Sequence, residues 1–227
     1  MAQQVLITGA AGGLGQHVTQ LFLNYGWEVI ATALTDEEQH WLGSLPHCRT
    51  ILCDVTRTDQ VAQLAAELPP TLDAVVHLVG GIRAGKPIEE TAEEDFHSMW
   101  ELNAHSTYLI LRATLPILKR TAGAFVAIGA KTVLHTEINK ALYGAAKAAV
   151  VHLVLAAAEE GRASGMRANV IVPSILRTEA NLQWARNGEE QHWVDPADVA
   201  ETIAFLCSDA GRGVTGCIVP MYGKIPA

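Results

Sequence analysis

A short apolar segment followed by a glycine-rich turn constrains the fold of this chain more than any other feature. Residues 5–7 (Val-Leu-Ile) are typical of a buried strand, and the Thr-Gly pair 8–9 that follows begins a tight turn in the glycine-rich stretch Thr-Gly-Ala-Ala-Gly-Gly-Leu-Gly. Beyond the turn, Leu14, Val18 and Phe22 recur at helical spacing. The glycines therefore lie where a buried strand turns into a helix.

A turn of this kind suits a pyrophosphate. The start of a helix presents unpaired backbone N–H groups and the positive end of the helix dipole to an anion. Glycine lets a phosphate approach the backbone without a Cβ in the way. The spacing here is Gly-x3-Gly-x-Gly rather than Gly-x-Gly-x-x-Gly. From this stretch alone, a glycine-rich turn without a ligand stays open as the alternative.

The rest of the chain alternates between strand-like and helix-like segments, which predicts an α/β fold with a parallel sheet. We find no internal repeat, low-complexity tract or linker, so we expect one domain over residues 1–227. The expected strands are 5–8, 28–33, 50–53, 74–78, 124–128, 167–172 and 217–219, and the expected helices are 13–25, 36–42, 58–67, 92–120, 142–163 and 196–208.

Composition and charge exclude several classes of partner. The net charge of −8 and the lack of a basic stripe argue against binding to nucleic acid or to an anionic membrane. No apolar run reaches the length of about 18 residues that a membrane helix needs. No His, Cys, Asp or Glu cluster has metal-ligand spacing, so we expect no metal site. The start lacks the pattern of a signal peptide, and the four cysteines form no C-x-x-C pair, which together favour a reducing, cytoplasmic setting.

Tyr143 and Lys147 form the chemical centre of the chain. Their i, i+4 spacing on the predicted helix places them on one face. A lysine cation beside a phenol favours the phenolate and would lower the tyrosine pKa from about 10. We therefore expect Tyr143 to donate or accept a proton near neutral pH.

The ends of the predicted strands carry further candidates. Ala33 ends the second strand, where an acid would bind the ribose hydroxyls and a base would bind a 2′-phosphate, so NAD and NADP stay equally open. Asp54 could reach an adenine amino group or could be a solvated loop residue. His77 reads as a satisfied buried histidine, with a ligand role as the alternative. Gly80 and Gly81 let the backbone pass close to a ribose.

The combination of these motifs resembles the short-chain dehydrogenase/reductase family over nearly the whole chain. The resemblance implies a Rossmann-type, doubly wound parallel sheet of seven strands with helices on both faces, an NAD or NADP cofactor, and hydride transfer to or from a small substrate. The implied catalytic residues are Tyr143 as acid/base, Lys147 holding the nicotinamide ribose, and Asn103 holding a water in a proton relay. The implied cofactor-binding residues are Thr8, Gly9, Gly13, Leu14, Gly15, Ala33, Asp54, Val55, Gly80, Gly81, Tyr143, Lys147, Pro173 and Thr178.

One departure from the family pattern matters. The family has a serine thirteen residues before the tyrosine, and this chain has Ala130 there. Loss of a donor aimed at developing negative charge costs about 3 kcal/mol of transition-state stabilisation. Thr132 is the nearest hydroxyl, and Lys131 reads as a surface lysine. The Gly-Ala-Lys stretch 129–131 is similar to the dihydropteridine reductases, which also lack the serine. A pterin or quinone-like ring accepts hydride readily, so it needs that donor less.

Two further expectations concern the substrate side and the assembly. Residues 179–193 are predicted to form a flap in which Trp184 and Trp193 stack on a flat ring or pack onto the core. The resemblance implies a homodimer or homotetramer. Because Ala130 removes a donor, a non-catalytic dinucleotide-binding sensor or assembly protein is the alternative to an enzyme.

Overall fold

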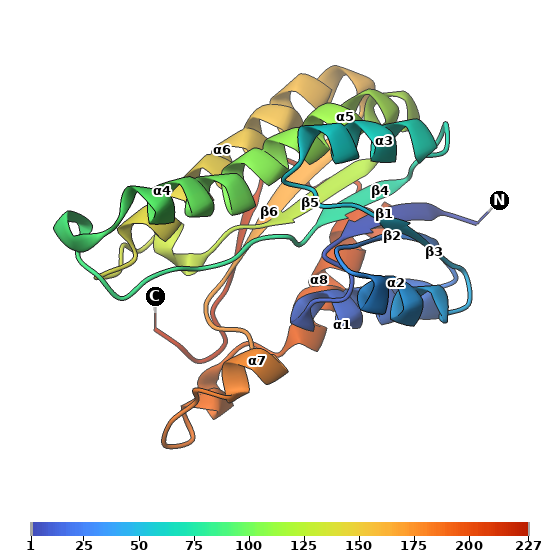
Figure 1. The fold of residues 1–227 in the computed structure, drawn as a ribbon. Helices are drawn as coiled ribbons and strands as arrows, with labels where there is room; N and C mark the ends of the chain where they lie inside the picture. Colours follow the sequence, from blue (N-terminus) through green and yellow to red (C-terminus); the bar gives the residue numbers. More distant parts are fainter. Residues whose placement is uncertain (1, 227) are drawn as a thin grey trace.

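The computed structural model describes residues 2–226 and contains one sheet of seven parallel strands in the order β3-β2-β1-β4-β5-β6-β7 (Figure 1). This topology confirms the predicted doubly wound α/β fold. The strands are β1 (Gln4–Thr8), β2 (Glu28–Ala33), β3 (Cys48–Leu52), β4 (Ala74–His77), β5 (Ala124–Ile128), β6 (Arg167–Pro173) and β7 (Ile218–Met221).

Helices cover both faces of the sheet (Figure 1). On one face lie α1 (Gly13–Asn24), α2 (Asp36–Gly43) and α8 (Pro196–Cys207). On the other lie α3 (Thr58–Glu67), α4 (Glu93–Met99), α5 (Ser106–Thr121) and α6 (Ala141–Gly161). The short α7 (Glu179–Leu182) projects beyond the sheet. Single 3-10 turns occupy Ile88–Glu90, Lys131–Val133, Arg162–Ser164, Glu189–His192 and Asp209–Gly211.

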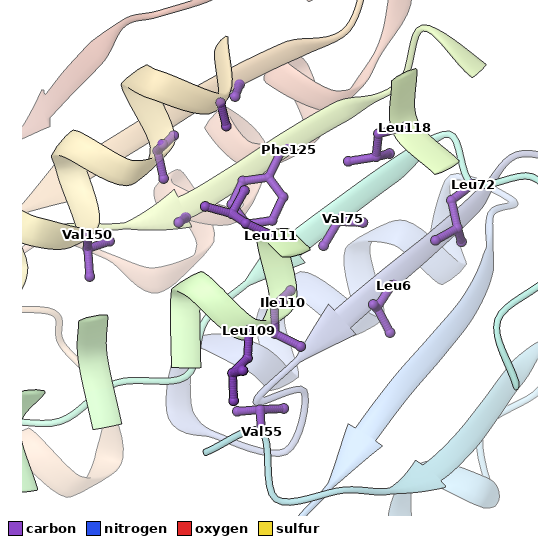
Figure 2. Packing of buried hydrophobic residues seen from close by; sticks show 14 of the residues in the cluster. Leu6, Val55, Leu72, Val75, Leu109, Ile110, Leu111, Leu118, Phe125 and Val150 are labelled. Carbon is purple, nitrogen blue, oxygen red and sulfur yellow. The ribbon is translucent and has the colours of Figure 1, made fainter. Parts of the chain in front are cut away.

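The strands form because short apolar runs are buried on both faces, as parallel sheets require. Alternate residues of each strand supply the two hydrophobic clusters. Leu6, Val75 and Phe125 point toward α5, where Ile110 and Leu118 meet them (Figure 2). Each such side chain contributes about 1.5–3 kcal/mol by leaving water.

Most predicted boundaries lie within two residues of the observed ones, and two segments show a difference with a structural reason. The third strand begins at Cys48, two residues before its predicted start, and ends at Leu52. The predicted single helix 92–120 is interrupted by a π-helical turn, Trp100–His105, between α4 and α5. A π-turn contains one residue more than the α-helical repeat, so an apolar periodicity alone does not locate it.

The apolar helix α6 is a core helix. By length and composition alone, the segment Ala141–Ser164 could cross a membrane. In the fold, however, Val150, Val151 and Val154 are buried in the cluster between α6, α5 and the sheet. The first turns of α6 carry Tyr143 and Lys147.

The order of the strands reverses at β1, which pairs with both β2 and β4. In open α/β sheets a ligand binds at the carboxyl ends of the strands on either side of such a switch point. The glycine-rich turn follows β1, and Gly80–Gly81 lie just beyond β4. The fold therefore brings both glycine motifs to one edge of the sheet.

Candidate functional site

The glycine-rich turn leaves the start of α1 open to an anion. Gly9 has a φ of 71°, in the left-handed region, and a Cβ on Gly15 would lie 2.0 Å from the Gly9 carbonyl oxygen. The N-cap of α1 is Gly12, which offers no side-chain cap, and the first turn holds no acidic residue. The first N–H groups of the helix are thus available to a pyrophosphate, and the dipole favours its charge.

Thr178 lies against this turn. A Cβ on Gly13 would come within 2.9 Å of the Thr178 side chain, so the loop after β6 contacts the turn after β1. The Thr178 hydroxyl accepts a hydrogen bond from the backbone N–H of Asn181 at 3.4 Å and caps α7. Thr178 and the glycine-rich turn, both expected to contact the dinucleotide, are therefore adjacent.

Three predicted cofactor-binding residues have buried side chains. Thr8, Ala33 and Val55 are at most 3% exposed, so little of these side chains faces the cleft, and their contact with a cofactor stays a prediction. The Thr8 hydroxyl is hydrogen-bonded to Nδ1 of His77 at 2.7 Å. Burial, together with the nearby charge of Lys147, lowers the pKa of His77 to about 3. His77 is therefore neutral and structural.

Asp54 is half-buried at the end of β3. Its Oδ1 accepts hydrogen bonds from the Thr56 backbone N–H at 2.9 Å and from the Thr56 hydroxyl at 2.7 Å. The carboxylate thus stabilises its own turn through one oxygen. Contact between Asp54 and an adenine stays a prediction.

Asn103 lies in the π-helical turn and is fully buried. Its Nδ2 donates to the carbonyl of Gly81 at 3.0 Å and to that of Met99 at 2.9 Å. Its Oδ1 accepts from the N–H of Gly81 at 3.2 Å. The side chain therefore fixes the loop beyond β4, and the Asn103 carbonyl accepts from the Thr107 hydroxyl at 2.7 Å. A relay water at Asn103 stays a prediction.

Lys147 reaches from α6 to the end of β5. Its ammonium donates to the carbonyl of Ile128 at 2.9 Å, and burial lowers its pKa to about 8. A Cβ on Gly80 would lie 2.7 Å from this ammonium and 2.8 Å from Oδ1 of Asn103. The lysine, the asparagine and the glycine therefore meet at one point beside Tyr143's helix.

The pKa of Tyr143 does not follow the expectation from its spacing to Lys147. Burial, and secondarily the charge of Glu137, raise the pKa of this phenol to about 12. The expected lowering by Lys147 is wrong for this structure, because burial desolvates the phenol and the lysine ammonium is directed at the Ile128 carbonyl. Tyr143 thus holds its proton at neutral pH.

A cavity of about 590 Å³ brings Tyr143 and Lys147 together with Gly80 and Gly81 in its wall. Pattern reading missed the ion pair of Glu137 with Lys140, at 2.7 Å, and also Ile225. No local signal marks these residues, since tertiary contacts alone place them in the wall. The lining residues are Leu14, Leu78, Gly80, Gly81, Ile82, Ile128, Gly129, Ala130, Lys131, Thr132, Glu137, Lys140, Tyr143, Lys147, Pro173, Ser174, Ile175, Leu176, Asn181, Trp184 and Ile225.

Lys131 is not the surface residue expected from the sequence. It is only partly exposed, and its ammonium donates to the carbonyl of Pro226. The same ammonium lies 5.6 Å from the centre of the Tyr222 ring. Lys131 therefore ties the C-terminal segment to the cavity wall.

A glycine-rich turn suited to a dinucleotide, at a switch point and next to a half-buried tyrosine and a buried lysine, is the arrangement of a nicotinamide-dependent oxidoreductase. A family model described as enoyl-(acyl carrier protein) reductase matches residues 9–223. The chain belongs to this family of short-chain dehydrogenases/reductases and is an NAD(P)-dependent oxidoreductase. An enzyme, rather than a non-catalytic dinucleotide-binding protein, is thus supported.

Individual relatives agree with this assignment. The chain is 28% identical over 235 residues to dehydrogenase/reductase SDR family member 6 of Danio rerio, covering 96% of this chain and 95% of that protein. It is 28% identical to the 7alpha-hydroxysteroid dehydrogenase of Escherichia coli strain K12, covering 96% and 92%. The structure of ElxO with NADP bound superposes with a TM-score of 0.90 at 27% identity, covering 98% of each chain. The cofactor class NAD or NADP is confirmed.

Proposed function

We propose that this enzyme reduces a small carbonyl or a flat conjugated ring, of the pterin or quinone kind, with Tyr143 as the proton donor. The observation that carries the proposal is the placement of Tyr143 and Lys147 in the wall of one cavity that also contains the glycine motif after β4. When bound, the nicotinamide exchanges a hydride with the substrate, and the chain supplies the proton.

The state of Tyr143 favours the reductive direction. With a pKa of about 12, the phenol carries its proton at neutral pH and can give it to the substrate oxygen or nitrogen that gains negative charge. Lys147 has a pKa of about 8 and is charged below that pH. Stabilisation of the phenolate left after proton transfer would require this cation to turn from the Ile128 carbonyl toward Tyr143.

The walls of the cavity favour a flat ring. Ile175 and Leu176 supply apolar surface, and the half-exposed indole of Trp184 lies among the lining residues. Trp184 also packs on the buried Trp193, with ring centres 4.8 Å apart, so the indole is held in place. Ala130 provides no hydroxyl to a substrate carbonyl, which suits an electron-poor acceptor as in the dihydropteridine reductases that stretch 129–131 resembles.

The charge beyond β2 favours NAD(H) over NADP(H). Thr35 caps α2, and Oε2 of Glu38 accepts from the N–H of Leu34 at 2.7 Å. With Asp36 and Glu37, three acids occupy the first turn of α2. A 2′-phosphate on the adenosine ribose would be repelled by these charges, while ribose hydroxyls would not.

The first experiment is a titration with NADH and with NADPH, followed by oxidation of the tighter one with quinonoid dihydropterin, quinones and ketones. We expect NADH to bind with a Kd at least about tenfold lower, and the ring substrates to turn over fastest. Tyr143→Phe should lose about 10²- to 10⁴-fold in kcat while keeping its cofactor affinity. Binding without turnover of any acceptor would overturn the proposal.

We also propose a homodimer or homotetramer in the cytoplasm. Phe96 and Trp100 stack at 6.1 Å and are both nearly half exposed on α4 and the π-turn, so they offer apolar surface for a second copy. The four cysteines are free, which suits a reducing compartment. Light scattering of the wild type and of Trp100→Lys tests the assembly, and a monomeric wild type would contradict it.

A further inference from the structure

We infer that the hydroxyl of Thr132 is the group that hydrogen-bonds the substrate in place of the serine that this chain replaces with Ala130. The inference rests on the proposed function, because it concerns the same cavity. Thr132 lies in the 3-10 turn Lys131–Val133, two residues after Ala130, and lines the cavity that contains Tyr143. Thr132 is therefore a specificity-determining residue for the reaction.

The hydroxyl of Thr132 is buried and unpaired. The residue is 7% exposed, and its Oγ1 has no hydrogen-bond partner within residues 2–226. Leaving a buried hydroxyl unpaired is unfavourable, so such groups in native proteins call for an explanation. A substrate atom in the adjoining cavity would supply the missing partner.

The position of Thr132 relative to Tyr143 is suitable for this role. The Thr132 side chain packs over Gly144, the residue after Tyr143: a Cβ on Gly144 would lie 3.7 Å from Cβ of Thr132 and 3.8 Å from its Oγ1. The turn that carries Thr132 thus contacts the start of α6 directly. A substrate placed at the Tyr143 hydroxyl would adjoin this turn.

Several other polar side chains in the cavity wall are already engaged. The Lys131 ammonium donates to Pro226, and the Ser174 hydroxyl donates to the Tyr222 carbonyl at 2.9 Å. Lys140 is paired with Glu137 at 2.7 Å. Thr132 keeps a hydroxyl that can turn to a substrate without breaking a bond within the described part of the chain.

The Thr132 hydroxyl could hydrogen-bond either of two kinds of substrate atom. As a donor, the hydroxyl would stabilise a carbonyl oxygen that gains charge as hydride reaches the adjacent carbon and Tyr143 delivers the proton. As an acceptor, it would pair with a ring N–H of a conjugated heterocycle. Both are single hydrogen bonds at the reacting end of the substrate, so they act on kcat more than on KM.

The test compares Thr132→Val, which keeps the shape and loses the hydroxyl, with Thr132→Ser, which keeps the hydroxyl and loses the methyl. We expect Thr132→Val to lose about 10²- to 10³-fold in kcat on ketone acceptors and less on electron-poor rings, with cofactor Kd unchanged. Thr132→Ser should stay within a few-fold of the wild type. Ala130→Ser in the Thr132→Val background should restore part of the rate.

The melting temperature gives a second readout that needs no substrate. Removal of an unpaired buried hydroxyl should raise Tm, by about 2–4 °C if the gain is near 1 kcal/mol. Thr50→Val is the matched control, because Oγ1 of Thr50 on β3 is also buried with no hydrogen-bond partner among the residues that the structure describes, and it does not line the cavity. That variant should gain stability and keep its rate.

The outcomes separate this inference from the proposed function. If Tyr143→Phe abolishes turnover and Thr132→Val does not change it, the inference is overturned and the proposed function stands. If Thr132→Val lowers Tm, the hydroxyl is a structural hydrogen-bond donor and the inference is also overturned. If the wild type turns over no acceptor, both fail. Loss of rate with a gain in Tm supports the inference.

Discussion

Gly80 packs so closely against Lys147 that a Cβ on residue 80 would lie 2.7 Å from the lysine ammonium. The ammonium cannot move away freely, because it is buried and donates to the Ile128 carbonyl at 2.9 Å. On its other side the same Cβ would press on Oδ1 of Asn103, which holds the N–H of Gly81. Residue 80 therefore has to be a glycine for Lys147 to keep its observed position.

The first prediction is that Gly80→Ala folds but loses at least about tenfold in kcat/KM, because a displaced Lys147 no longer supports Tyr143. Gly213→Ala is the control, since a Cβ there would meet nothing within 4 Å. Circular dichroism establishes folding and steady-state kinetics gives the rate. Unchanged kinetics in Gly80→Ala would show that the position of the ammonium is not critical.

A second prediction follows from the pKa of Lys147, which burial lowers from 10.5 to about 8. Between these values the unfolded chain holds a proton that the folded chain lacks, so this group makes the unfolding free energy rise with pH. Relative to Lys147→Met, the wild type should gain at most about 3 kcal/mol between pH 8 and pH 10.5. Urea unfolding of both proteins across this window measures the difference, and a constant difference would contradict the prediction.

A third prediction concerns acid stability. Burial lowers the pKa of His77 from 6.5 to about 3, so between these values the unfolded chain takes up a proton and the folded chain does not. The stability due to neutral His77 is present above pH 6.5 and is lost as pH falls toward 3, by at most about 5 kcal/mol. His77→Asn can still bond to Thr8 and lacks this titration. The unfolding free energy of this variant should depend less on pH between 6.5 and 3 than that of the wild type. Parallel curves for the two proteins would contradict the lowered pKa of His77.

Much of the fold could be predicted because the strands are short apolar runs that end at glycine, threonine or proline. Residues 74–78 and 124–128 are examples, where the local pattern and the buried sheet agree. The third strand is harder, since Cys48 and Arg49 at an edge carry no apolar alternation. The π-turn was not predictable, because apolar spacing on either side of it matches an α-helix.

The candidate site, like the fold, could be predicted from the sequence only in part. Motif spacing locates Tyr143 and Lys147, but it carries no information on burial or on the direction of the ammonium, so it predicted the wrong sign for the shift in the Tyr143 pKa. Ile225 and the Glu137–Lys140 pair reach the cavity only through tertiary contacts. One such contact is the hydrogen bond from the Lys224 N–H to the His192 carbonyl at 2.9 Å, which joins the C-terminal segment to the loop that follows α7.

The π-turn at Trp100–His105 has a cost for the helix and a benefit for the site. One surplus residue interrupts the regular hydrogen-bond ladder, and it turns the Asn103 amide inward to the Gly81 backbone. Deletion of one residue in this segment would let the ladder run without a break and would rotate every residue before it by about 100°. Such a chain would have a more regular helix, but the loop beyond β4 would lose the hydrogen bonds from Asn103 that hold it. A regular helix and the observed position of this loop therefore exclude each other.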